Sequence, residues 1–205
     1  MAGDDVSGDA AVIEATRRWL EKAVIGLNLC PFAKAVHAKG QVGFVVSAAT
    51  TIDALVEDLA AELKALEAAD PAVVDTVLLI HPRVLGDFED YNDFLDIADT
   101  LLDELELTGI LQIASFHPQY RFAGTQADAI ENYTNRSPYP MLHLLREDSV
   151  ERAVTTYPDV ADIPERNIVT MNRLGLDGWN DLLKDDWCET AKARRRKGDA
   201  KNGEE

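Results

Sequence analysis

Cys30 is the first residue of this sequence whose type and setting could support chemistry. It precedes Pro31, and proline is favoured in the first position of a helix, so we expect a short helix to begin there with Cys30 as its N-cap. A thiol at the positive end of a helix dipole is favoured as its thiolate, which is the nucleophile and the metal ligand. In the alternative interpretation, Cys30 is a small buried apolar residue, because Leu29 and Phe32 flank it.

Two histidines occupy equivalent positions, each between an apolar run and a proline. His81 follows Ile80 and precedes Pro82, and His117 stands in the same way between Phe116 and Pro118. If both runs are parallel strands, the histidines meet at the carboxyl edge of the sheet, where open α/β folds bind ligands. We expect an acid–base or ligand role for them. In the alternative, each imidazole bonds a loop carbonyl while the proline ends the strand.

Residues 117–140 form a segment that is too long for an ordinary connection and lacks a sustained apolar period. The segment is rich in aromatic and amide side chains, so we expect a structured binding loop. Arg136 is the only basic residue between Arg121 and Arg146, and it could hold an anionic substrate group or neutralise nearby carboxylates. The predicted substrate-binding residues are Asn132, Tyr133, Asn135, Arg136, Tyr139 and His143.

The sequence permits a metal without indicating one. Cys30, His81, His117 and His143 are suitable zinc or iron ligands, but none of them shares the close spacing of a Cys-x-x-Cys or His-x-His element. The glycine patterns of the phosphate-binding loop and of the dinucleotide-binding turn do not occur either. The sequence therefore names no cofactor.

The spacing of apolar residues predicts the elements that would position these side chains. We expect strands at 41–47, 76–80, 110–116 and 141–145, and helices at 12–27, 52–66, 88–105, 148–156 and 163–183. Strand and helix alternate with short links, which is typical of right-handed βαβ units. The fold expected is a single α/β domain over residues 10–185, with a mainly parallel sheet of about four strands and helices packed on it. Residues 1–9 and 186–205 are expected to be disordered tails.

Charge and cysteine content narrow the range of partners. The 205 residues include 37 acidic and 20 basic side chains, which give a net charge of −17. Such a field repels phosphates and anionic lipids, so neither nucleic acid nor a membrane is expected as a partner. The basic run at 192–197 could touch RNA or an acidic partner but is typical of a solvated tail. Two cysteines and no signal-peptide pattern indicate a cytoplasmic protein.

Four long runs of residues carry a resemblance to a known family. They are Ala23–Ala33 (AVIGLNLCPFA), His81–Leu95 (HPRVLGDFEDYNDFL), Ser115–Thr125 (SFHPQYRFAGT) and Asn132–Glu147 (NYTNRSPYPMLHLLRE). Together with Trp19 these runs resemble the bacterial domain-of-unknown-function 1415 family, over about residues 10–184. The resemblance implies one bacterial domain and assigns no activity, cofactor or catalytic residue.

Two functions fit these residues. The first is a small enzyme acting on an anionic molecule, with Cys30 as nucleophile or metal ligand, His81 and His117 as acid–base groups or ligands, and the 117–140 loop as substrate anchor. The second is a non-catalytic domain that binds a metabolite or a partner peptide through the same loop. An enzyme needs a nucleophile or metal beside a base, whereas a binder functions with Cys30 buried and inert. The sequence does not determine the oligomeric state.

Overall fold

A four-stranded mixed sheet forms the centre of the computed structural model, which describes residues 3–157 and 159–199, and the side chains of 8–157 and 159–183. The strands β1 (Val42–Val46) and β2 (Thr76–Ile80) pair in parallel. The strand β4 (Met141–Arg146) runs antiparallel to β2 on one side and to β3 (Leu111–Phe116) on the other. The order across the sheet is therefore β1-β2-β4-β3, and β1, β2 and β3 all end at the same edge.

The predicted α/β class is confirmed, whereas the prediction of a mainly parallel sheet is wrong. Between β3 and β4 the chain forms only a short 3-10 helix, η2 (Ile130–Thr134), and it re-enters the sheet at the edge where β3 ended. A parallel strand would require a crossover to the opposite edge, which usually takes a full helix. The 117–140 segment provides no such crossover, so β4 enters antiparallel between β2 and β3.

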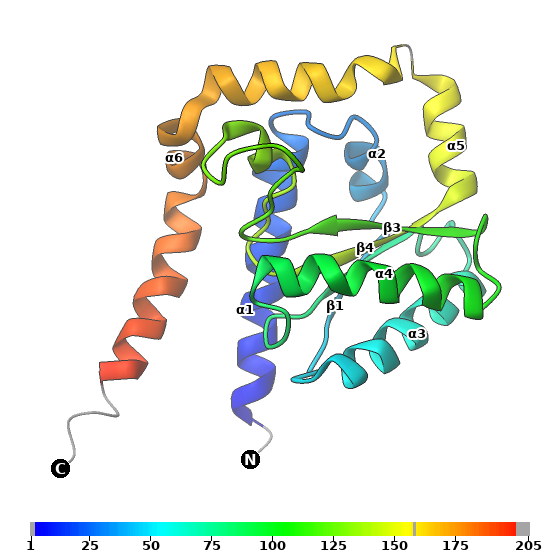
Figure 1. Cartoon of the computed structure of the whole chain (residues 1–205), viewed down its shortest axis with the longest axis horizontal. Coiled ribbons are helices and arrows are strands. Elements are labelled where there is room, and N and C mark those ends of the chain that lie inside the picture. Colours follow the sequence, from blue (N-terminus) through cyan, green and yellow to red (C-terminus); the bar gives the residue numbers. More distant parts are fainter. Residues whose placement is uncertain (1–2, 158, 200–205) are drawn as a thin grey trace.

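Helices cover both faces of the sheet (Figure 1). One face packs against α3 (Ile52–Ala68) and α4 (Phe88–Glu104). The other face packs against α1 (Gly3–Trp19), its π-helical continuation η1 (Leu20–Ile25) and the first half of α6 (Ile163–Asp199). The remaining helices are α2 (Ala33–Ala38), α5 (Glu147–Thr156) and the 3-10 turn η3 (Val160–Asp162).

Strand periodicity separates the core into two layers, as the sequence of β2 illustrates. Val77 and Leu79 join the cluster under α3 and α4, whereas Leu78 and Ile80 join the cluster under α1 and η1. All five residues of β2 are buried, because a strand paired on both sides and covered on both faces meets no water. A residue that directly follows Ile80 must therefore turn toward the α4 face.

Helices extend into both segments that the sequence predicts to be tails, and the outermost residues of these segments, 1–2 and 200–205, lie outside the described part of the chain. Helix α1 begins at Gly3, inside the expected N-terminal tail, and Asp9 on α1 lies 3.2 Å from the guanidinium of Arg83. Helix α6 changes direction at Gly175, whose φ of 66° is non-helical, and it continues to Asp199. Residues 190–199 are rich in Ala, Lys and Arg, which favour helix. Within the described residues, no helix is both long and apolar enough to cross a bilayer.

Candidate functional site

The carboxyl ends of β1, β2 and β3 bring three polar side chains to one edge of the sheet. Ser47, His81 and His117 each follow directly after their strand, and the three residues are 3%, 0% and 0% exposed. Open α/β sheets bind their ligands at this edge. The structure thus places the two histidines at the predicted edge, but it buries both of them completely.

Each buried histidine holds the loop that connects β2 to α4, residues 82–87. The Nδ1 atom of His81 lies 3.1 Å from the carbonyl oxygen of Val84, and Nε2 of His117 lies 3.2 Å from that of Leu85. A carbonyl can only accept, so each of these nitrogens carries the proton of a neutral imidazole. Leu85 itself adopts a φ of 55°, a region that is unfavourable for a leucine. The two imidazoles therefore stabilise this turn. This arrangement corresponds to the second interpretation of the sequence, in which each histidine bonds a loop carbonyl.

Tyr91 of α4 lies beside both imidazoles. Its ring centroid is 5.8 Å from that of His81 and 5.0 Å from that of His117. Its hydroxyl donates to the carbonyl of Met141 and accepts from the backbone N–H of Phe116. The phenol therefore joins the first residue of β4 to the last residue of β3.

Burial in this cluster keeps both histidines uncharged at neutral pH. Desolvation lowers the pKa of His81 to about 4, helped by the nearby His117. Desolvation also lowers the pKa of His117, against the effects of the Leu85 carbonyl and Asp87. The second nitrogen of His117, Nδ1, accepts from the backbone N–H of Gln119, whereas Nε2 of His81 has no hydrogen-bond partner among the described residues. Neither imidazole has solvent-exposed surface, so both act here as fixed neutral groups.

Cys30 lies apart from the histidines. It packs, partly buried, with the apolar cluster under α1 and η1, which covers the opposite face of the sheet from Tyr91. The helix predicted to begin at Pro31 begins at Ala33 instead, with Phe32 as its N-cap, so Cys30 does not cap it. The reason is local: the carbonyl of Cys30 accepts from the N–H of Ala33, in a turn that precedes the helix. The fold does not bring Cys30, His81 and His117 into one site.

His143 also lies away from the strand-end histidines. It stands in β4 between Leu142 and Leu144, which face α3 and α4, so its ring faces the α1 side of the sheet and contacts Phe116. Its Nε2 lies 2.7 Å from the hydroxyl of Thr76, which donates to the carbonyl of Leu144. Burial lowers the pKa of His143 to about 4. Its observed contacts are therefore internal to the sheet.

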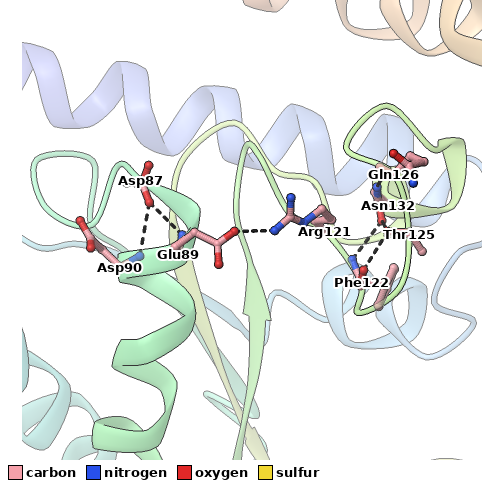
Figure 2. Close-up of polar contacts among 8 residues, drawn as sticks. All are labelled: Asp87, Glu89, Asp90, Arg121, Phe122, Thr125, Gln126 and Asn132. Atoms are coloured by element: carbon pink, nitrogen blue, oxygen red, sulfur yellow. Dashed lines mark hydrogen bonds and ion pairs between the residues drawn. The ribbon is translucent and has the colours of Figure 1, made fainter.

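Asn132 organises the 117–140 loop from the inside. Its Oδ1 accepts from the N–H of Phe122 at 3.0 Å and from the hydroxyl of Thr125 at 2.7 Å, and its Nδ2 donates to the carbonyl of Gln126 at 2.7 Å. Figure 2 shows these three partners arranged around the amide. Asn132 is 0% exposed, so it holds the loop together and does not contact solvent.

The other predicted loop residues divide between internal contacts and a cavity. Asn135 bonds the carbonyl of Ser115, and Tyr139 packs in the cluster under α1. Tyr133 packs against Trp179 of α6 and lies under the guanidinium of Arg136, 4.0 Å from ring centre to Cζ. The guanidinium also donates to the carbonyls of Tyr120 and Ala127. Arg136 also lines a cavity.

That cavity, which we call the loop cavity, has a volume of about 320 Å³ and separates the 117–140 loop from the first turn of α4. It is lined by Asp87, Phe88, Glu89, Gln119, Arg121, Ala127 and Arg136. Sequence reasoning did not select Gln119 and Arg121, although both belong to the His-Pro-Gln-Tyr-Arg run that follows β3. One feature of the sequence could have identified these two residues. They belong to a polar run that directly follows a strand, and that strand ends at the ligand-binding edge of the sheet.

Charges in the loop cavity are balanced by contacts within the chain. Arg121 forms an ion pair with Glu89, with 2.5 Å between Nη2 and Oε1, and both side chains are substantially exposed (Figure 2). Asp87 caps α4 by accepting from the N–H groups of Glu89 and Asp90. No group of three or more His, Cys, Asp or Glu side chains that could hold a metal occurs in the described part of the chain. The cavity is therefore suited to bind a polar ligand through the guanidinium groups of Arg121 and Arg136.

Comparison with known proteins identifies a family but no characterised relative. The chain matches no curated protein and no solved structure. A family model described as a protein of unknown function, DUF1415, matches residues 11–181. The matched region includes the strand-end histidines, the 117–140 loop and the cavity between that loop and α4. Because this match spans most of the sequence, the chain belongs to the DUF1415 family.

Proposed function

We propose that this protein binds a small anionic molecule in the loop cavity. The observation that carries the proposal is the presence of two guanidinium groups, those of Arg121 and Arg136, together with the amide of Gln119 in one cavity of metabolite size. Guanidinium groups bind carboxylate and phosphate groups in a bidentate geometry, and their charge persists at all physiological pH values. A carboxylate or a phosphate ester is therefore the expected recognition group.

Arg136 supplies the fixed part of the proposed site. Its contacts with the carbonyls of Tyr120 and Ala127 and with the ring of Tyr133 hold the guanidinium in place, and two carbonyl contacts leave donors for a ligand. A side chain already ordered in the unliganded protein loses little further entropy on binding.

Arg121 supplies the adjustable part of the proposed site. Its ion pair with Glu89 is exposed, and exposed ion pairs contribute little stability. An anionic ligand can therefore replace Glu89 at the guanidinium with little loss. Glu89 acts in this scheme as a competitor of the ligand.

Binding is favoured over catalysis because of where the reactive side chains lie. The catalytic interpretation combined Cys30 with His81 and His117, but Cys30 packs on the α1 side of the sheet, whereas both histidines pack against Tyr91 on the α4 side. Both histidines are buried and bonded to the loop of residues 82–87. The binding proposal assigns no role to Cys30, so Cys30→Ser is expected to bind ligand normally. We place this binding in the cytoplasm because the chain has only two cysteines.

Calorimetric titration with succinate and inorganic phosphate, and with uncharged succinamide, tests the proposal. We expect at least one anion to bind and succinamide to fail. Arg121→Gln should weaken binding by about tenfold, because a charge-assisted hydrogen bond is lost. Glu89→Gln should strengthen it by a few fold, because the competitor is removed.

Arg173→Gln on α6 is the matched control, since it removes the same charge from an exposed position outside the cavity. This variant is expected to bind as the unmodified protein does. The proposal fails if neither anion binds, or if Arg173→Gln weakens binding as much as Arg121→Gln does.

A further inference from the structure

A second cavity, of about 500 Å³, lies between the amino-terminal ends of α3 and α4. Val84, Leu85 and Gly86 of the 82–87 loop contribute to its wall, while the next three residues, Asp87–Glu89, line the loop cavity. Figure 2 shows Glu89 directed toward Arg121 and Asp90 directed away from it. The first turn of α4 thus contributes side chains to two different cavities, and we call the second one the helix cavity.

The interior of the helix cavity is apolar. Phe94 and Leu85 contribute buried side chains, while Ile52 on α3 and Ile97 on α4 are each 43% exposed. Isolated exposed aliphatic residues are ordinary, but here two of them line the same cavity. An apolar ligand body would remove both isoleucines from water, which favours its binding.

Two carboxylates, Asp90 and Asp93, line the same cavity, and both residues are exposed. No basic side chain among the described residues pairs with either of them. The surrounding potential is strongly negative, because α3 and α4 together carry twelve acidic residues and a single basic one, Lys64. These carboxylates would repel an anionic ligand, and they would attract a cation more strongly than a neutral ligand.

The walls of the helix cavity are held in place before any ligand arrives. His81 and His117 hold the carbonyls of Val84 and Leu85, whose side chains line the cavity. On the opposite wall, Thr51 caps α3 by accepting from the N–H of Ala54. A preformed cavity loses less entropy on binding than one that must be ordered by its ligand.

We propose that the helix cavity binds an organic ammonium ion with an apolar body, such as an arylalkylamine. The ammonium group lies between Asp90 and Asp93, and the apolar body packs on Phe94, Ile52 and Ile97. This site is separate from the anion site of the loop cavity and does not depend on it.

Titration of the full ¹⁵N-labelled chain with 4-phenylbutylamine, followed by amide chemical shifts, tests this proposal. We expect shifts at Gly86 and Ile97, which line the cavity from the 82–87 loop and from α4. The alcohol 4-phenylbutan-1-ol has the same body without the charge and should bind about tenfold more weakly, as expected for the loss of one charge-assisted contact.

Asp93→Asn should weaken amine binding by roughly fivefold or more, by the same loss of a charge-assisted contact. Asp96→Asn is the matched control, because it removes the same charge from an exposed position on α4 outside the cavity. It should change binding by less than about twofold, because Asp96 lines no part of the cavity and an exposed charge acts only weakly across water. Arg121→Gln, which tests the anion site, should not affect the amine.

Three results would overturn the assignment. Equal binding of amine and alcohol would show an apolar cavity without charge recognition. Equal weakening by Asp93→Asn and Asp96→Asn would show attraction to the acidic surface as a whole. Shifts confined to residues outside the cavity, or no shifts at millimolar amine, would show that the cavity is not a binding site.

Discussion

The amide of Asn132 shows how much of the candidate site depends on single buried side chains. Its three hydrogen bonds join Phe122, Thr125 and Gln126, which span the turn between Arg121 and η2. Arg121 and Arg136, the two guanidinium groups of the loop cavity, lie on either side of this turn in the sequence. Their relative placement therefore depends on a residue that does not line the cavity.

We predict that Asn132→Ala lowers the free energy of unfolding by about 2–4 kcal/mol, because it leaves buried donors and an acceptor unpaired. Urea denaturation monitored by circular dichroism measures this change. Asn172→Ala serves as the control, since Asn172 makes one exposed hydrogen bond on α6 and its loss should cost less than about 1 kcal/mol. Similar values for the two variants would contradict the role assigned to Asn132.

Sequence reasoning located His81 and His117 at the correct edge because strand periodicity and the following prolines determine where a strand ends. It did not determine their burial, which depends on Tyr91 and Phe88 packing over the rings from α4. It also placed Cys30 in the same candidate site, because a sequence does not state on which face of a sheet a distant loop packs. Side-chain chemistry was predictable here, whereas the assembly of those side chains was not.

At the level of elements, each predicted strand was found within one residue of its expected limits. The error concerned the direction of β4, because apolar period is the same for parallel and antiparallel strands. The direction of a strand depends on whether the preceding segment crosses to the opposite edge of the sheet. Residues 117–140 have no regular spacing of apolar residues from which such a crossover could be predicted or excluded. The prediction that a helix starts at Pro31 rested on the Cys-Pro dipeptide alone, and the helix begins at Ala33 instead.

Arg146, at the end of β4, connects that strand to α3. Its Nη2 donates to the carbonyls of Leu66 and Ala69 at the carboxyl end of α3, and to that of Val74, which precedes β2. A cation at this end of a helix is favourable because the last carbonyls of the helix carry a partial negative charge. One side chain therefore fixes how α3 connects to β2.

We predict that Arg146→Met lowers the free energy of unfolding by about 1–3 kcal/mol and accelerates amide exchange at residues 69–74, because three carbonyls lose a charged donor. Native-state hydrogen exchange measures both effects. Arg152→Met on α5 removes an exposed guanidinium that contacts only Ser149 among the described residues, and it should leave exchange in this segment unchanged. If exchange at 69–74 is the same in both variants, Arg146 does not hold the end of α3.

For the whole molecule, the main consequence of its buried histidines is sensitivity to acid. His81, His117 and His143 all have a pKa below the ordinary value of 6.5, because burial disfavours the charged form. The unfolded chain therefore binds protons that the folded chain excludes. This contribution to stability is complete above pH 6.5 and is lost as the pH falls toward about 4.

We predict that the free energy of unfolding falls steeply between pH 6.5 and 4, by on the order of 3 kcal/mol for His81 alone. His81→Asn should make this fall shallower, since asparagine retains a donor for the Val84 carbonyl and has no proton to gain. Denaturation midpoints measured across this range test the expectation. His37→Asn, which alters a histidine at the surface beside Glu21, should retain the steep fall. A steep fall that persists unchanged in His81→Asn would refute the assignment.

The position of β4 between β2 and β3 has a consequence for biosynthesis. The ribosome makes β1, α3, β2, α4 and β3 first, yet β2 and β3 do not pair with each other. Until residues 141–146 emerge, each of these two strands exposes a row of unpaired backbone groups that could pair with another chain. The nascent protein can therefore complete its β1–α3–β2 unit early, but its sheet closes only when the last strand inserts between two that were made before it.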